Sequence, residues 1–192
     1  MTIQELFIQT NEGLKSVIAQ IKDDQWKLSV PPEMTRTPAT LEELVRYHTY
    51  DDAWVPDVLA GKTIEEVGDT YDYLRTPENK DVVSNYNSNN ERANTVVRDF
   101  SDLEITTHLS YGDFPAKDFL QHIISFRAFH IYDIAKFIGV DTTMDPELVQ
   151  ALLDEFTPVI ENYRKMGVFP PPVEVPEDAS PQVKLLGLVG RQ

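Results

Sequence analysis

The stretch FPAKDFLQHIISFRAFHIYDIAKFIG, residues 114–139, predicts one long helix on which the rest of the fold depends. Pro115 suits a first helical turn and Gly139 a C-terminal stop, so this helix should span about 24 residues. At about 100° per residue, its apolar face consists of Phe119, Leu120, Ile123, Ile124, Ile131, Ile134, Phe137 and Ile138. Arg127 and His130 fall inside that face. An unpaired buried guanidinium costs many kcal/mol, so Arg127 must meet a carboxylate or line a wet cavity.

A second interrupted stripe lies earlier in the chain. Thr40 and Glu43 have the spacing of a capping box, and the sequence predicts a helix over residues 41–59. The apolar stripe of this helix consists of Leu41, Leu44, Val45, Val55 and Leu59. His48 and Asp52, one turn apart, occupy the middle of the stripe. Two predicted helices therefore place polar side chains at the centre of their apolar faces.

The helix over residues 41–59 has a further side without charge, formed by Tyr47, Tyr50 and Trp54. Two uncharged faces indicate a central position or an additional packing partner. The polar segment that follows, residues 62–80, is expected to be a loop.

The expected fold class is all-α, with an extra C-terminal helix and a Pro-rich extended tail. Residues 105–111 read as an extended connector, and the tail at 168–181 must be extended because five of its 14 residues are proline. We expect one domain over residues 1–192, with a bundle core at 1–139 and the C-terminal helix and tail at 140–192. The other helices are expected at 2–22, 81–100, 145–166 with a kink at Pro158, and 182–189.

The composition excludes the kinds of chemistry that need a cysteine in the protein. The 192 residues include no cysteine, which excludes disulfides, thiolate zinc sites and a protein thiol nucleophile. Any thiol chemistry would need a low-molecular-weight thiol as co-substrate. The N-terminal sequence lacks the basic and apolar regions of a signal peptide, and no window has the length of a membrane span. We therefore expect a cytoplasmic protein.

The net charge of the chain argues against polyanionic partners. Seventeen basic residues against 32 acidic ones give a net charge of −15. Such a surface repels phosphate backbones and anionic lipid. No nucleic-acid or membrane partner is expected, and the anticipated partner is a small-molecule ligand.

His48, Asp52, Arg127 and His130 are the candidate site residues, because facing helices of a bundle are where metal and cofactor sites assemble. In one interpretation His48, Asp52 and His130 hold a divalent metal such as zinc, iron or nickel. In the other, Asp52 pairs with Arg127, the two histidines are hydrogen-bonded, and no metal is needed. Arg127 would repel a dication and compete for Asp52. Asp51 points away from the main stripe and is not included.

Four stretches resemble a known family: TLEELVRYHTYDDAWVPDVLAG, LSYGDFPAKDFL, HIYDIAKFIGVD and GVFPPPVEVPEDASPQVKLLGLVGRQ. The chain resembles the DinB-like superfamily, and within it the mycothiol-dependent maleylpyruvate isomerase and its metal-binding-domain relatives. The resemblance implies an up-and-down four-helix bundle that holds a divalent metal, usually zinc. In that family the ligands are a histidine of the second helix and a carboxylate-x-x-x-His pair of the fourth, and the metal activates the thiol of mycothiol.

The family pattern is degenerate in this chain. His48 matches the first histidine and His130 the last, but Phe126 occupies the carboxylate position. Either Asp52 replaces the missing ligand, or the chain keeps the fold without the metal. The first alternative predicts a metal- and thiol-dependent transferase or isomerase with a small-molecule pocket between the second and fourth helices. The second predicts a metal-free protein that binds a small molecule or anion, in which Arg127 receives the anion and the two histidines donate hydrogen bonds. A homodimer is left open.

Overall fold

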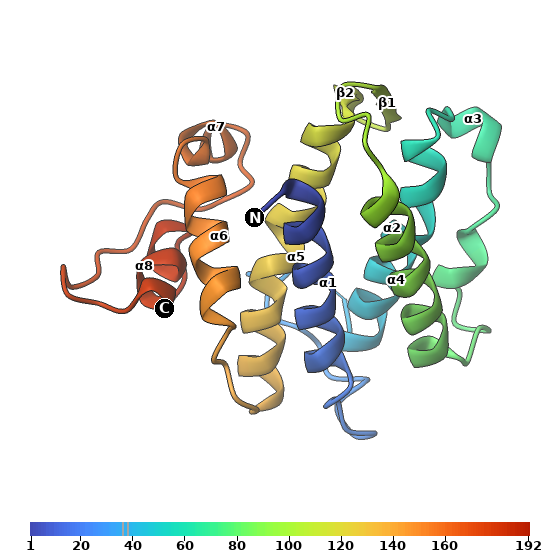
Figure 1. Ribbon diagram of the computed structural model, residues 1–192. Coiled ribbons are helices and arrows are strands. Elements are labelled where there is room, and N and C mark those ends of the chain that lie inside the picture. The colour runs from blue at the N-terminus through green and yellow to red at the C-terminus, as the bar shows by residue number, and fades with distance from the viewer. Residues whose placement is uncertain (36, 38) are drawn as a thin grey trace. The chain divides into compact units, whose positions relative to one another are not determined.

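The computed structural model describes residues 1–35, 37 and 39–192 (Figure 1). The protein is mostly helical, with 57% of its residues in helices and a small β-hairpin. Its described elements are α1 (Ile3–Ile18), α2 (Leu41–Leu59), α3 (Ile64–Val67), the 3-10 helix η1 (Asp72–Arg75), α4 (Val82–Asp99), β1 (Thr106–Leu109), β2 (Gly112–Pro115), α5 (Ala116–Ile138), α6 (Pro146–Phe156), α7 (Ile160–Lys165) and α8 (Pro181–Leu188). The expected helical class is confirmed, whereas the hairpin was not expected.

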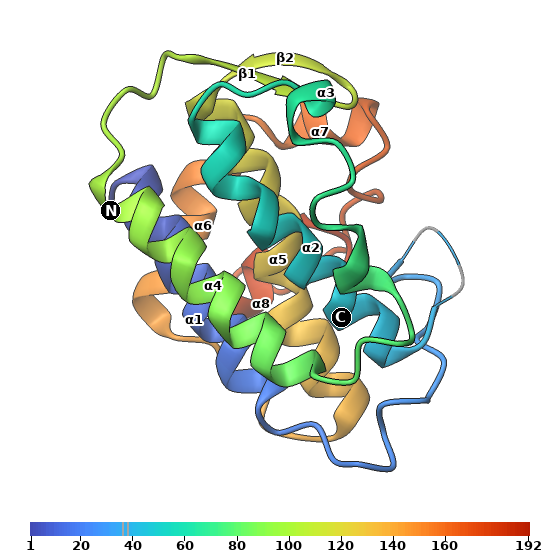
Figure 2. The same ribbon diagram turned by 90° about the vertical axis from the view of Figure 1, so that its right-hand side faces the viewer.

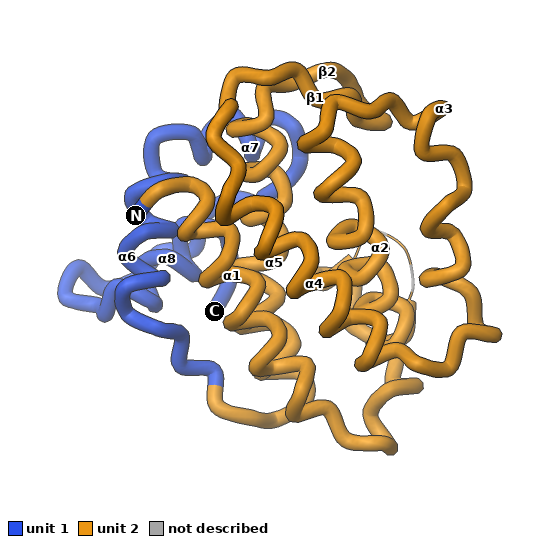
Figure 3. Tube along the Cα trace, turned by 45° about the vertical axis from the view of Figure 1, so that its right-hand side comes forward, with its two compact units in different colours: residues 1, 142–192 blue, residues 2–141 orange. Residues whose placement is uncertain are grey.

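The chain divides into two compact units (Figure 3). Residues 2–141 contain α1 to α5 and the hairpin, and residues 142–192 form the other unit together with Met1. The expected boundary between a core at 1–139 and a C-terminal part at 140–192 lies close to this division. A single domain over residues 1–192 stays a prediction.

Within residues 2–141, four long helices run alongside one another (Figure 2). The close backbone approaches are α1 with α5, α2 with α4, and α1 with α4. The backbones of α2 and α5 approach each other less closely. Long side chains bridge these two helices, and all four candidate residues belong to them.

The ends of the two site helices follow local rules. Thr40 and Glu43 form the expected capping box at the start of α2, with Thr40 N donating to Glu43 Oε2 at 2.7 Å. Gly139 ends α5 in the left-handed conformation, with φ of 75°. The helix α5 starts at Ala116, one residue after the expected first-turn residue Pro115, which is its N-cap. The expected connector at 105–111 is extended over Thr106–Leu109, and its pairing with Gly112–Pro115 in a hairpin was not predicted.

The uncharged second side of α2 does have a packing partner. Tyr50 and Trp54 pack against a cluster that includes Tyr71 and Leu74. These two residues come from the segment predicted as a loop, which contains α3 and η1. Arg75 adds a cation–π contact, with its guanidinium carbon 4.0 Å from the centre of the Tyr50 ring.

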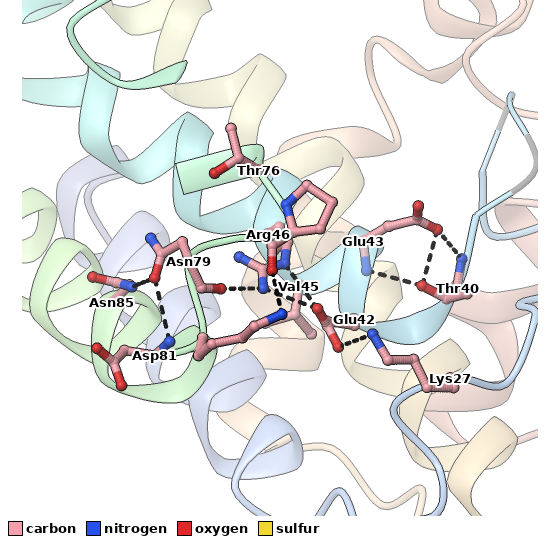
Figure 4. A network of polar contacts seen from close by, with 12 residues as sticks. Lys27, Thr40, Glu42, Glu43, Val45, Arg46, Thr76, Asn79, Asp81 and Asn85 are labelled. Carbon is pink, nitrogen blue, oxygen red and sulfur yellow. Dashed lines mark hydrogen bonds and ion pairs between the residues drawn. The ribbon is translucent and has the colours of Figure 1, made fainter. Parts of the chain in front are cut away.

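Buried Arg46 fastens this covering segment to α2 (Figure 4). Its Nε donates to Glu42 Oε1 at 3.1 Å, and its Nη1 donates to the Leu74 carbonyl at 3.3 Å. Its Nη2 donates to the Asn79 carbonyl. The Asn79 side chain in turn accepts from Asn85 Nδ2 at 2.8 Å, on α4. One guanidinium thus connects α2, the covering segment and the start of α4.

Residues 142–192 contain three helices among those described. The single helix predicted at 145–166 is divided into α6 and α7, because Pro158 ends the first helix instead of only bending it. The closing helix expected at 182–189 is confirmed as α8. An aromatic group stabilises this unit, with ring centroids of Tyr163 and Phe169 5.7 Å apart.

Among the described residues, no helix combines the length and the apolar character needed to span a bilayer.

Candidate functional site

A buried ion pair links α2 to α5. The side chains of Asp52 and Arg127 are 0% and 1% exposed, and Arg127 Nη1 donates to Asp52 Oδ1. Asn11 of α1 joins the pair, accepting from Arg127 Nη1 at 2.7 Å and donating to Asp52 Oδ1 at 3.4 Å. The carboxylate that Arg127 requires is therefore Asp52, as one of the two sequence interpretations expected.

Asparagines extend this ion pair into a polar row that reaches α4. Asn11 Nδ2 donates to Asn94 Oδ1 at 2.9 Å, and Asn94 Nδ2 donates to Glu12 Oε1 at 2.9 Å. Asn90 also belongs to the row, accepting from Asn94 Nδ2 at 3.3 Å. Sequence reasoning missed these residues. The available signal was that Asn90 and Asn94 are one turn apart within the apolar pattern of the helix predicted at 81–100.

Some polar atoms of the ion pair have no hydrogen-bond partner among the residues described. These are Asp52 Oδ2 and the Nε and Nη2 atoms of Arg127, all of them buried. Burial raises the pKa of Asp52, and the charge of Arg127 and the Asn11 hydrogen bond oppose that rise. The stability of the Asp52 carboxylate therefore depends on Arg127.

The two candidate histidines contact each other. His48 Nε2 and His130 Nδ1 are 2.9 Å apart, and the residues are 0% and 5% exposed. One of these nitrogens carries the hydrogen and donates it, and the other accepts the hydrogen bond. Burial, followed by the charges of His130 and Arg127, lowers the pKa of His48 well below its usual value. His48 is thus a neutral imidazole at neutral pH.

Phe126 fills the space beside the histidines. Its ring stacks on His48 with 4.8 Å between centroids and lies 5.3 Å from the His130 centroid. An apolar ring therefore stands where the resemblance implies a carboxylate ligand.

The donor set does not fit a divalent metal. Asp52, the carboxylate proposed to replace the missing ligand, is held by Arg127 and Asn11. His48 and His130 use facing nitrogens on each other. Across the described ranges, no group of three His, Cys, Asp or Glu side chains is arranged to hold a metal ion. The predicted ligands therefore belong to two separate pairs: His48 contacts His130, and Asp52 contacts Arg127.

Asp51 was set aside on helical geometry, yet the structure gives it an unusual environment. The side chain is half-buried, and burial raises its pKa to about 7 against the opposing charge of Arg127. The negative charge of Asp52 contributes to the rise, and the charge of Arg75 also opposes it. A helical-wheel argument could not find this residue, because its burial and the opposing charge of Arg127 depend on how α2 packs against other elements.

Tyr111 is affected by the charge of Asp51, and it contacts His122. Tyr111 Oη and His122 Nδ1 are 3.2 Å apart, joining the hairpin loop to α5. Partial burial, followed by the charges of Asp51 and Tyr47, raises the pKa of Tyr111 to about 12. Burial also lowers the pKa of His122. Tyr111 therefore connects the surroundings of Asp51 on α2 with His122 on α5.

Comparison with known proteins adds no relative to this description. No protein-family model, curated protein or solved structure matches the chain. Function must therefore be inferred from the site itself.

Proposed function

We propose that residues 2–141 form a DinB-like up-and-down four-helix bundle with a small-molecule site between α2 and α5 that works without a metal. The fold part of the proposal is supported by the four long helices and their packing order. The site part is supported by the polar and aromatic side chains that these two helices direct at each other.

The engagement of Asp52 by Arg127 carries the metal-free part of the proposal. A metal at this position would have to take Asp52 from a buried guanidinium and leave that cation unpaired, which costs several kcal/mol. It would also lie close to the remaining positive charge. Metal binding by two neutral imidazoles would offset little of this cost.

The resident groups suit hydrogen bonding. The neutral His48 has a buried Nδ1 without a partner among the described residues, and this atom can form a hydrogen bond with a ligand while Nε2 shares the hydrogen bond with His130. Because Asp52 already balances the charge of Arg127, the site favours a neutral or cationic ligand over the anion anticipated from the sequence.

The competing function is the metal- and thiol-dependent transferase or isomerase implied by the family resemblance. It requires zinc or another divalent ion at His48 and His130, and a mycothiol-type thiol as co-substrate. In this function Asp52 must exchange Arg127 for the metal. The two functions therefore differ in the partner of one carboxylate.

Metal analysis of protein purified without an affinity tag tests the proposal. We expect far less than one divalent ion per chain and weak zinc binding by calorimetry. In Arg127→Gln, the freed Asp52 should bind zinc more tightly. Close to one ion per chain in the unmutated protein, lost in both His48→Ala and Asp52→Ala, would overturn the metal-free site and support the transferase.

Small-molecule binding is tested separately by NMR of the histidine side chains. A library of neutral and cationic fragments should shift the signals of His48 and His130 in the unmutated protein. Binding should be lost in His48→Ala and retained in the control His108→Ala, since His108 pairs with Asp113 on the hairpin at 2.9 Å. Fragments that bind equally well to both variants would contradict a site at His48.

A further inference from the structure

Aromatic side chains of three elements gather on the side of α2 that carries Asp51. Tyr47 precedes it by one turn on α2, and the Tyr47 and Phe126 rings are 6.0 Å apart in an edge-to-face arrangement. Tyr111 lies in the hairpin loop, close enough for the charge of Asp51 to affect its phenol. His122 of α5 contacts Tyr111, with ring centroids 5.7 Å apart. We call Tyr47, Tyr111 and Phe126 the aromatic rim.

The rim is accessible from solvent. Tyr47 is 50% exposed and Tyr111 is 60% exposed, both high fractions for large aromatic residues. Asp51 and Phe126 are half-buried, and His48 and His130 are buried. Exposure thus decreases from the rim towards the histidine pair.

When Asp51 is ionised, the charges near the rim leave one negative charge. Asp52 and Arg127 cancel as a buried ion pair, and His48 is neutral. Arg75, whose charge also acts on Asp51, is engaged by Asp72 at 2.8 Å and by the Tyr50 ring. Among the described residues, no hydrogen bond or ion pair neutralises Asp51. Its partly desolvated carboxyl lacks a cation of its own.

We infer that Asp51 and the aromatic rim recognise the ammonium group of a small organic amine. A carboxylate supplies charge-assisted hydrogen bonds to an ammonium, and aromatic faces attract its positive charge. This inference rests on the proposed small-molecule site between α2 and α5 and specifies its ligand class. The net charge of −15 also favours the approach of cations.

Three probes of one shape test the charge preference: 2-phenylethylammonium, 2-phenylethanol and 3-phenylpropanoate. Their binding is measured by NMR at about pH 8, where the Asp51 carboxyl is mostly ionised. We expect the ammonium to bind about tenfold more tightly than the alcohol, and the carboxylate to bind least.

Asp51→Asn is compared with Asp113→Asn, which removes the same charge from an exposed hairpin position. Asp51→Asn should weaken ammonium binding about tenfold and leave alcohol binding unchanged, whereas Asp113→Asn should change neither. Tyr111→Leu, at an exposed position that can be replaced without disturbing the interior, should weaken the ammonium more than the alcohol.

Equal binding of ammonium and alcohol, or equal effects of Asp51→Asn and Asp113→Asn, would overturn the inference. In both cases the alcohol would still report a small-molecule site, so the proposed function would stand. If none of the three probes binds, the inference is also overturned, and the proposed function is then decided by the independent fragment and metal measurements.

Discussion

Arg127→Met is the substitution that tests the centre of the site most directly. It removes the main cation of Asp52, whose side chain is 0% exposed. The remaining contact to Asp52 Oδ1 in this pair is the 3.4 Å hydrogen bond from Asn11, and Oδ2 has no partner among the described residues. We expect a loss of about 3 to 5 kcal/mol in the free energy of unfolding at neutral pH.

The loss should depend on pH. Arg127 opposes the burial that raises the pKa of Asp52, so the variant has a higher folded-state pKa than the unmutated protein. A carboxyl with a raised folded pKa binds its proton more strongly when folded, and stability falls as pH rises through that interval. The destabilisation should therefore be smaller at about pH 5 than at about pH 8.

The double variant Arg127→Met, Asp52→Leu separates the pair from general packing. With both charges replaced by apolar side chains, the loss should be only about 0 to 2 kcal/mol, part of it from Asn11. Arg75→Met is the control, because its ion pair with Asp72 and its contact with the Tyr50 ring lie at an exposed position and should together contribute only about 1 kcal/mol.

Urea unfolding followed by tryptophan fluorescence is a suitable assay. The two tryptophans, Trp26 and Trp54, both lie within residues 2–141, so the signal reports on the unit that contains the site. Equal destabilisation by the single and double variants would show that Asp52 and Arg127 do not depend on each other and would refute the reasoning.

Three further predictions concern the surroundings of the pair. Because burial raises the pKa of Asp51 to about 7, stability should fall as pH rises from about 4 to 7, and Asp51→Asn should flatten that profile in urea titrations. The full shift of about three pKa units corresponds to about 4 kcal/mol, but water screens this half-buried group. We therefore expect Asp51→Asn to raise the free energy of unfolding by about 1 to 2 kcal/mol at about pH 8. An unchanged pH profile would contradict the raised pKa of Asp51. Arg46→Met should lower the free energy of unfolding by about 2 to 3 kcal/mol and increase amide hydrogen exchange at 74–79. The control Lys27→Met, at a side chain 76% exposed, should cost less than about 0.5 kcal/mol. Equal hydrogen exchange in both variants would argue against the connection through Arg46. Phe126→Glu places a carboxylate four residues before His130 and beside His48, and it should create zinc binding detectable by calorimetry, most strongly with Arg127→Gln; no zinc binding in that double variant would show that the two histidines are not positioned as ligands.

Local signals explain which helix ends were predicted well. The Thr40 and Glu43 capping box and the Gly139 stop act within a few residues, so the spacing alone placed the start of α2 and the end of α5. The hairpin was not predicted, because the pairing of Phe114 with Thr107 depends on a turn at 110–111 between two short strands with only a weak alternating pattern. Likewise, α3 and η1 are short helices that depend on packing against Tyr50 and Trp54.

The sequence by itself determined that the fold is mostly helical and that four polar residues interrupt two apolar stripes. Periodicity and the cost of burying an unpaired guanidinium are sufficient for both conclusions, because each depends on one helix at a time. It also determined that Arg127 needs a carboxylate partner.

Only the tertiary structure decided which of these side chains contact each other. It paired Asp52 with Arg127 and His48 with His130, and it added Asn11 and Asn94 from two other helices. It also half-buried the side chain of Asp51, and this burial raises the pKa of that carboxyl. Contacts and desolvation of this kind arise between elements, so no pattern within one helix encodes them.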